Sequence, residues 1–259
     1  MEHSRVPGFV GNSLGAGEKL EPLSAGISVI TGKHHTFNTD TILLANFSMP
    51  RSGEICADFG TGCGTIPLLW CARSAPRRVY AVELQEEACS LAKRSVYLNG
   101  LENQIEVIHE DIKALKQNRS LPFNLDHIAC NPPYKPNNTG IHSAQEQLRI
   151  ARHEVACGFS DIVTTASAFL RWGGRFFCCL RPERLCDAML TLRSAGLEPK
   201  RLRFVQQRIN KPPFLFLLQA NRGGRPGLKV EPTLFIESEN GGWSEEMLEI
   251  YGDYKEGRA

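Results

Sequence analysis

The stretch Asp58-Phe59-Gly60-Thr61-Gly62-Cys63-Gly64 decides the fold of this 259-residue chain. An apolar run at 55–59 leads directly into it, and a helical pattern follows at once. Glycines at a strand-to-helix turn let the backbone pass close beneath a ligand and let the helix start tightly against a sheet. The stretch therefore predicts the first strand and helix of an α/β domain, with a ligand site at the carboxyl ends of its strands.

The rest of the chain continues this alternation. Short β-branched apolar runs and longer amphipathic runs are typical of strands joined by helices into a mostly parallel, doubly wound sheet. We expect strands at 55–59, 79–83, 105–109, 126–130, 175–180, 201–207 and 214–220, and helices at 41–47, 65–72, 85–98, 145–171 and 182–195. The expected domains are an N-terminal extension and cap (1–50), the α/β domain (51–235) and an acidic C-terminal tail (236–259). Trp172, Phe176 and Phe177 lie on apolar segments and are expected in the core.

Composition narrows the class of protein. Nine cysteines are too sparse for a disulfide scaffold, and several lie in strand-like runs, so we expect reduced, mostly buried thiols. There is no Cys-x-x-Cys pair and no histidine spacing that completes a zinc site, so no metal is expected. The chain begins without a leader-like segment and has no apolar run of membrane-spanning length. We therefore expect a cytoplasmic protein.

Charge is uneven along the chain. Residues 171–229 hold thirteen Lys or Arg and three Asp or Glu, whereas residues 230–259 hold two and eight. Such runs are usually solvated faces, but a basic stretch can also mark where a polyanion docks. The sequence alone leaves both interpretations open.

Acidic residues lie at the ends of three successive predicted strands: Asp58, Glu83 and Asp111. A dinucleotide-binding turn needs a glycine where this chain has Thr65, and a carboxylate at Asp58 would repel a pyrophosphate. The same carboxylate suits the ammonium group of S-adenosylmethionine, and Glu83 and Asp111 suit a ribose and an adenine. The alternative is that Glu83 and Asp111 only cap the helices that follow them.

The fourth predicted strand ends in Asn131-Pro132-Pro133-Tyr134. Two prolines hold the backbone extended and remove two amide donors. An amino group on an aromatic ring is a poor nucleophile because its lone pair is delocalised. Acceptors at the Asn131 side chain and the Pro132 carbonyl favour a pyramidal nitrogen, and Tyr134 offers a face for stacking. The alternative is that these four residues only form a turn at the end of the strand.

These two motifs resemble those of the amino-methyltransferases that modify adenine N6, guanine N2 or protein glutamine N5. Segments 37–45 (FNTDTILLA) and 151–154 (ARHE) narrow the resemblance to the bacterial tRNA1(Val) adenine-37 N6-methyltransferases, over about residues 26–235. The resemblance implies a seven-stranded class I methyltransferase fold, S-adenosylmethionine as cofactor, and a tRNA methylated at adenine 37 in its anticodon loop.

The resemblance also implies the roles of particular residues. The target base is held by Asn131, Pro132, Pro133 and Tyr134. The cofactor is held by Thr39, Asp40, Asp58, Gly60, Gly62, Gly64, Glu83, Leu84, Asp111, Ile112 and Asn131. Candidates for RNA contact, which are equally plausible as solvated surface, are Lys33, Arg149, Arg152, His153, Arg222 and Arg225.

Four other functions compete with this one. A glutamine N5-methyltransferase carries a helical recognition domain before the glycine turn, for which this chain has too few residues. A guanine N2-methyltransferase of ribosomal RNA is less well matched by Tyr134. A nicotinamide oxidoreductase is disfavoured by Thr65 and Asp58, and a non-catalytic binding protein by the intact Asn131-Pro132-Pro133 motif. The oligomeric state stays open.

Overall fold

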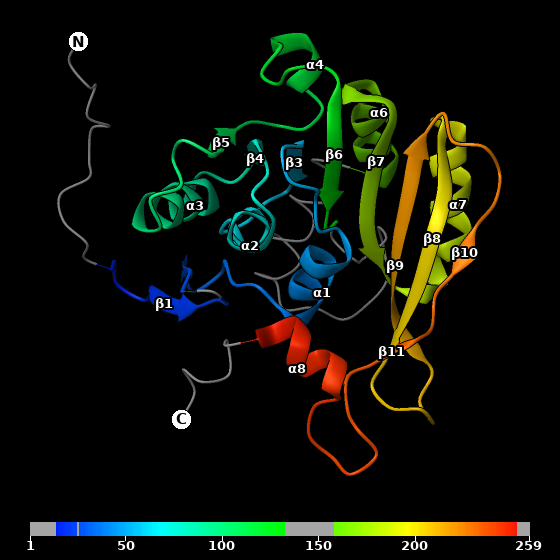
Figure 1. Ribbon diagram of the computed structural model, residues 1–259. Coiled ribbons are helices and arrows are strands. Elements are labelled where there is room, and N and C mark those ends of the chain that lie inside the picture. The colour runs from blue at the N-terminus through cyan, green and yellow to red at the C-terminus, as the bar shows by residue number, and fades with distance from the viewer. Residues whose placement is uncertain (1–13, 25, 133–157, 253–259) are drawn as a thin grey trace, which may run out of the picture.

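A nine-stranded sheet forms the centre of the computed structural model, which describes residues 14–24, 26–132 and 158–252 (Figure 1). Its order is β10-β8-β9-β7-β6-β3-β4-β5, with β11 also paired to β8. Only β9 runs antiparallel to its neighbours. The strands are β3 (Ile55–Phe59), β4 (Arg78–Glu83), β5 (Ile105–His109), β6 (Leu125–Cys130), β7 (Leu170–Leu180), β8 (Leu197–Gln206), β9 (Pro213–Arg222), β10 (Lys229–Val230) and β11 (Leu234–Phe235). The predicted α/β fold with a mostly parallel sheet is confirmed, but the sheet has nine strands and not the expected seven, because the two-residue strands β10 and β11 also pair with β8.

Helices cover both faces of this sheet. They are α1 (Thr39–Phe47), α2 (Thr65–Ser74), α3 (Glu86–Leu98), the single turn α4 (Leu115–Asn118), α6 (Phe159–Phe169), the 3₁₀ turn η1 (Pro182–Arg184), α7 (Leu185–Ser194) and α8 (Glu245–Tyr251). One apolar cluster joins the sheet to α1, α2, α3 and α8, and the other joins it to α4, α6 and α7. Of the long helix predicted at 145–171, residues 145–157 lie outside the described part, and α6 ends where β7 begins.

The alternation of side chains along β3 explains this layering. Cys56 belongs to the first cluster, and Ala57 and Phe59 belong to the second. Successive residues of a strand face opposite sides of a sheet, so Asp58 faces the side of α1 and α2, at the end of the strand. β3, which is buried from Cys56 to Phe59, thus carries one charged residue at the edge where ligands bind.

The N-terminal residues form a hairpin, β1 (Lys19–Pro22) with β2 (Ser28–Thr31), which lies against α3. The Ser95 hydroxyl accepts a hydrogen bond from the Ile30 amide at 2.9 Å, and Arg94 pairs with Glu18 at 2.5 Å. The small N-terminal cap that the sequence predicts is therefore a hairpin fixed to the helix that follows β4.

The segment expected to be a separate acidic tail is, as far as residue 252, part of the domain. Met247, Ile250 and Tyr251 of α8 are buried in the first apolar cluster. The Arg73 guanidinium donates to the Ile250 carbonyl at 2.8 Å. The charges that suggested a tail are instead used in ion pairs with β8, between Arg201 and Glu231, Arg203 and Glu246, and, in the turn after β8, Arg208 and Glu237. The basic stretch and the acidic segment thus neutralise each other in part.

Trp172 does not lie in the core, where its apolar neighbours predicted it. Phe176 and Phe177 are fully buried, as expected, but the Trp172 side chain is 76% exposed. Gly173, at φ +75°, and Gly174 follow it. A Cβ on Gly174 would lie 2.8 Å from the Arg171 carbonyl oxygen, so only glycine fits this irregular start of β7. The irregular backbone turns Trp172 outward.

Among the described residues, no helix is both long enough and apolar enough to cross a membrane.

Candidate functional site

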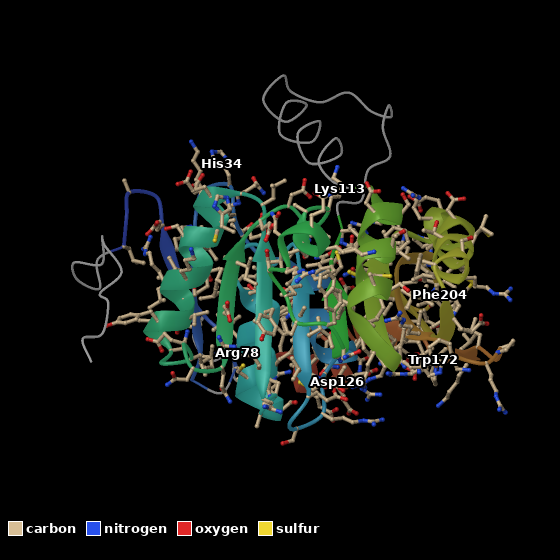
Figure 2. All side chains as sticks on the ribbon, turned by 90° about the horizontal axis from the view of Figure 1, so that it is seen from above. His34, Arg78, Lys113, Asp126, Trp172 and Phe204 are labelled. Carbon is tan, nitrogen blue, oxygen red and sulfur yellow. The ribbon has the colours of Figure 1, made fainter. Side chains whose placement is uncertain are left out.

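Four parallel strands end together at one edge of the sheet. Phe59 is in register with Val82 of β4 and with Cys130 of β6, and Glu83 is in register with His109 of β5. The residues that follow these strands therefore meet at the carboxyl edge, where ligands bind in open α/β sheets. In Figure 2, His34 and Lys113 mark this edge, and Arg78, Asp126 and Trp172 mark the opposite, amino edge.

The glycine turn after β3 has the geometry that its sequence predicts. Gly60, Gly62 and Gly64 have φ angles of +76°, +58° and +90°, which side-chain-bearing residues rarely adopt. A Cβ on Gly60 or Gly62 would meet no atom within 4 Å, whereas one on Gly64 would lie 3.4 Å from the Ala92 Cβ. Gly64 thus lies close to α3, in a position where a Cβ would make an ordinary contact, and the other two glycines leave open space above the turn.

Glu83, the last residue of β4, holds the glycine turn through a hydrogen bond. Its Oε2 accepts a hydrogen bond from the Gly62 amide at 2.8 Å, and its Oε1 accepts one from the Gln85 amide at 2.9 Å. The residue is buried, at 4% exposure. A carboxylate has about four acceptor sites, so each oxygen keeps capacity for a hydroxyl group. The competing interpretation, a residue that only caps the next helix, does not account for the bond to Gly62.

Asp58 is buried without a hydrogen-bond partner. Both of its carboxylate oxygens lack one among the described residues, as does the neighbouring Thr61 hydroxyl. Burial raises the pKa of Asp58 to about 7; the Glu83 charge acts in the same direction, and the nearby Thr61 hydroxyl opposes it. A buried ionised carboxylate without a partner costs free energy unless a cationic group pairs with it. Asp58 therefore fits a cationic ligand group and would repel a phosphate.

The third acid has a more local role. The Asp111 Oδ1 accepts a hydrogen bond from the Lys113 amide at 2.9 Å, so it caps the turn after β5. Asp111 and Ile112 are half-buried, and Leu84 is 39% exposed at the same edge. The alternative of a capping acid is thus realised at Asp111, although a carboxylate that accepts one amide bond still has acceptor sites for a ligand.

Asn131, which follows β6, is held from two sides. Its Nδ2 donates to the Thr41 hydroxyl oxygen at 3.2 Å, and its Oδ1 accepts from the Cys179 thiol at 3.2 Å. The Thr41 hydroxyl itself donates to the Asn38 Oδ1 at 3.0 Å. Because that donation turns an oxygen lone pair toward Asn131, the amide must present its NH₂ group to Thr41. The Asn131 oxygen is left on the side of Cys179.

The start of α1 is fixed to two other elements. Asp40 is buried and lies 3.7 Å from the Arg181 guanidinium, after β7. The Tyr251 hydroxyl of α8 donates to the Thr39 hydroxyl at 3.2 Å. Thr39 and Asp40 could be identified from the sequence, but these partners could not, nor could Thr41 and Cys179 beside Asn131. No local sequence signal indicates these partners, because each hydrogen bond joins residues that are 48 to 212 positions apart in the chain.

The remaining predicted residues divide into three groups. Pro132 is buried beside Asn131, whereas Pro133, Tyr134, Arg149, Arg152 and His153 lie outside the described residues. Lys33 is exposed in the turn after β2, next to His34 at the carboxyl edge. Arg222 and Arg225 lie at the end of β9, which is at the amino edge, so the structure does not bring them to the site.

Among the described residues, no group of three or more His, Cys, Asp or Glu could hold a metal ion.

Comparison with known proteins points to one class of enzyme. Residues 33–191 match the family model described as the methyltransferase small domain. A tRNA1(Val) (adenine(37)-N6)-methyltransferase of Shewanella sp. (strain MR-4) is 26% identical over 221 residues, covering 84% of this chain and 90% of that protein. The protein of the same name from Glaesserella parasuis serovar 5 is 32% identical over 151 residues, covering 58% and 60%.

Solved structures share the fold. A predicted O-methyltransferase from Agrobacterium tumefaciens has a TM-score of 0.66 at 22% identity, covering 85% of this chain and 97% of that one. The tRNA m1G37 methyltransferase of M. jannaschii has a TM-score of 0.55 at 14% identity, covering 81% and 58%. At these identities the likeness establishes the class I methyltransferase architecture and nothing finer.

Proposed function

The chain belongs to the methyltransferase small domain family, and from that membership we propose that it methylates adenine N6 at position 37 of tRNA1(Val), with S-adenosylmethionine as cofactor. Relatives that cover most of the chain carry this activity in their names. The observation in the structure that supports the proposal is the buried carboxylate of Asp58, which has no hydrogen-bond partner among the described residues and lies beside an open glycine turn.

The residues present fit this cofactor. S-adenosylmethionine supplies an electrophilic methyl group on a positively charged sulfur. The buried carboxylate of Asp58 would pair with the ammonium group of the methionine part. Gly60 and Gly62 leave room for the cofactor to contact the backbone of the turn. Glu83 would accept the ribose hydroxyls on the acceptor sites that Gly62 and Gln85 leave unused.

Further residues would hold the rest of the cofactor. Asp111 and Ile112 would contact the adenine, together with Leu84. Thr39 and Asp40 would border the methionine end, because α1 lies beside Asn131. These assignments give each of the three carboxylates a nucleoside or amino-acid group to bind and leave no place for a phosphate.

Asn131 would prepare the target nitrogen. Thr41 takes its NH₂ group, so Oδ1 is the atom of this amide that would accept an N–H bond from the adenine amine. A carbonyl oxygen has two lone pairs and can accept more than one hydrogen bond, and the Cys179 thiol donates one to Oδ1. With the Pro132 carbonyl as a second acceptor, both amine hydrogens are bound, which favours a pyramidal nitrogen with a reactive lone pair.

The test is methyl transfer from labelled S-adenosylmethionine to an unmodified tRNA1(Val) transcript, followed by nucleoside mass spectrometry. We expect N6-methyladenosine, and none in a matched transcript with guanine at position 37. Label on a ribosomal RNA guanine, or on a glutamine of a translation factor in place of the tRNA, would refute the substrate while keeping the methyltransferase chemistry.

A further inference from the structure

An aromatic and basic patch, in which Trp172, Arg225 and Lys229 are exposed and the other members half-buried, lies at the amino edge of the sheet, away from the candidate site. We define the amino-edge patch as Trp172, Lys200, Arg222, Arg225 and Lys229. The Trp172 indole lies directly on the loop that follows β9: a Cβ on Gly223 would be 2.2 Å from the indole Cζ2, so only glycine allows this contact. The side chain is nonetheless 76% exposed, which leaves a flat aromatic surface open.

The four cations of the amino-edge patch form no direct ion pair within the described part of the chain. The Lys200 ammonium donates to the Arg225 carbonyl at 3.0 Å, and Arg222 donates to the Leu170 carbonyl. Three acids on or beside the same and neighbouring strands are paired with other arginines: Asp126 with Arg171, Glu198 with Arg193 and Glu231 with Arg201. The patch therefore presents a net positive charge in a region where other arginines are neutralised.

A groove between α6 and α7 leads to this patch. Its volume is about 540 Å³, and Arg222 lies in its lining. Because α6 starts after the carboxyl edge and ends at β7, the groove extends between the two edges of the sheet. Hydroxyl groups dominate its lining and no acid contributes to it; the polar members are Ser160, Thr164, Ser167, Thr191, Ser194 and Arg222.

We propose that the amino-edge patch and this groove bind the RNA substrate outside the methylated loop, through backbone phosphates and one unstacked base. The inference rests on the proposed function. Guanidinium, ammonium and hydroxyl donors are the groups that hold RNA phosphates, and an open indole stacks on any base. Trp172 and Cys179, which contacts Asn131, are separated along β7 by roughly 20 Å, so the same nucleotide cannot reach both.

A protein partner fits these features less well. The core of a protein interface is apolar and depleted of charge, whereas this surface combines unpaired cations with hydroxyl groups. Leu190, at 69% exposure, is the large apolar side chain in the groove lining. Charge complementarity therefore favours a polyanion.

The experiment compares whole tRNA1(Val) with its isolated anticodon stem–loop in steady-state kinetics. Trp172→Ala removes the stacking surface, and Arg225→Glu with Lys229→Glu reverses two charges. We expect each variant to raise the Michaelis constant for whole tRNA by about tenfold, with turnover and the stem–loop kinetics unchanged. For the charge variant, the slope of log affinity against log salt concentration should become shallower by about one for each phosphate that is no longer bound.

Two matched controls accompany these variants. Ile209→Ala truncates another exposed apolar side chain, in the β8–β9 turn, and Lys93→Glu reverses an exposed charge on α3. Both should leave the preference for whole tRNA intact. Unchanged kinetics with whole tRNA in the patch variants, or equal losses with the stem–loop, would overturn the proposal. Failure of the wild-type protein to methylate either RNA would instead refute the proposed function, so the two failures are distinguishable.

Discussion

The pH dependence of cofactor binding should report directly on Asp58. Burial raises the pKa of this carboxyl to about 7, and it lacks a hydrogen-bond partner among the described residues. Only its ionised form can pair with the ammonium group of S-adenosylmethionine. The ionised fraction is about one tenth at pH 6 and about three quarters at pH 7.5. We therefore expect the association constant to rise about eightfold between these two pH values.

The same titration affects the stability of the ligand-free protein. The folded pKa of Asp58, about 7, is higher than the ordinary value of 3.8. The stability that this carboxyl contributes is therefore fully present below about pH 4 and is lost as the pH rises through 7. Three pKa units correspond to roughly 4 kcal/mol. Asp58→Asn should raise the free energy of unfolding at pH 8 by a sizeable part of that amount, and by less at pH 5.

Calorimetric titration with S-adenosylhomocysteine at pH 6, 6.5, 7 and 7.5, for wild type and Asp58→Asn, measures the binding effect. The upper limit stays below the ordinary pKa of the ligand's own amino group, near 8. Asp126→Asn is the matched control, because that carboxylate lies at the amino edge and is paired with Arg171. A flat wild-type profile, or an Asp58→Asn profile with the wild-type slope, would refute the reasoning.

Three further predictions concern Asn131, Thr41 and His127. Asn131→Ala should lower the rate of methyl transfer on the order of 100-fold or more with nearly unchanged cofactor affinity, and near-normal turnover would contradict its assigned role. Thr41→Val should lower turnover without raising the Michaelis constant for the cofactor. Thr41→Ser keeps the hydroxyl and should therefore keep the wild-type turnover. Burial, and secondarily the Arg175 charge, lowers the pKa of His127 well below its ordinary value. The stability that the neutral imidazole contributes to the folded protein is therefore fully present above about pH 6.5 and is lost as the pH falls. Urea unfolding of His127→Phe between pH 7 and 5 should show a shallower loss of stability than wild type.

The sheet and its ligand edge could be predicted because their signals are local. The apolar run 55–59, the glycine turn and the acid Glu83 each occupy one strand end, and parallel strands bring such ends together. Trp172 could not be placed in the same way. Its neighbours are apolar, and its exposure depends on how Gly173 and Gly174 bend the start of β7 against the Arg171 and Leu125 carbonyls.

Charge counted along the chain could not decide between a solvated face and a docking surface, for a related reason. Arg201 and Arg203 belong to the basic stretch, but their partners Glu231 and Glu246 come from the acidic segment that follows it. A linear window separates charges that the fold places side by side. The cations of the amino-edge patch form no ion pair with a described residue, and the acids Asp126, Glu198 and Glu231 bind other arginines, which no count of residues reveals.

The start of α1 and Asn131 act as one unit. Asn38 and Thr41 belong to the segment before the glycine turn, and Asn131 lies 90 residues after Thr41. The Asn38 side chain caps α1 by accepting from the Thr41 amide at 3.0 Å, and it also accepts the Thr41 hydroxyl proton. That bond fixes the hydroxyl oxygen as an acceptor, which in turn fixes the orientation of the Asn131 amide. On the proposed function, the helix cap therefore determines which atom of Asn131 faces the adenine amine, so a change at Asn38 or Thr41 should act on methyl transfer through Asn131.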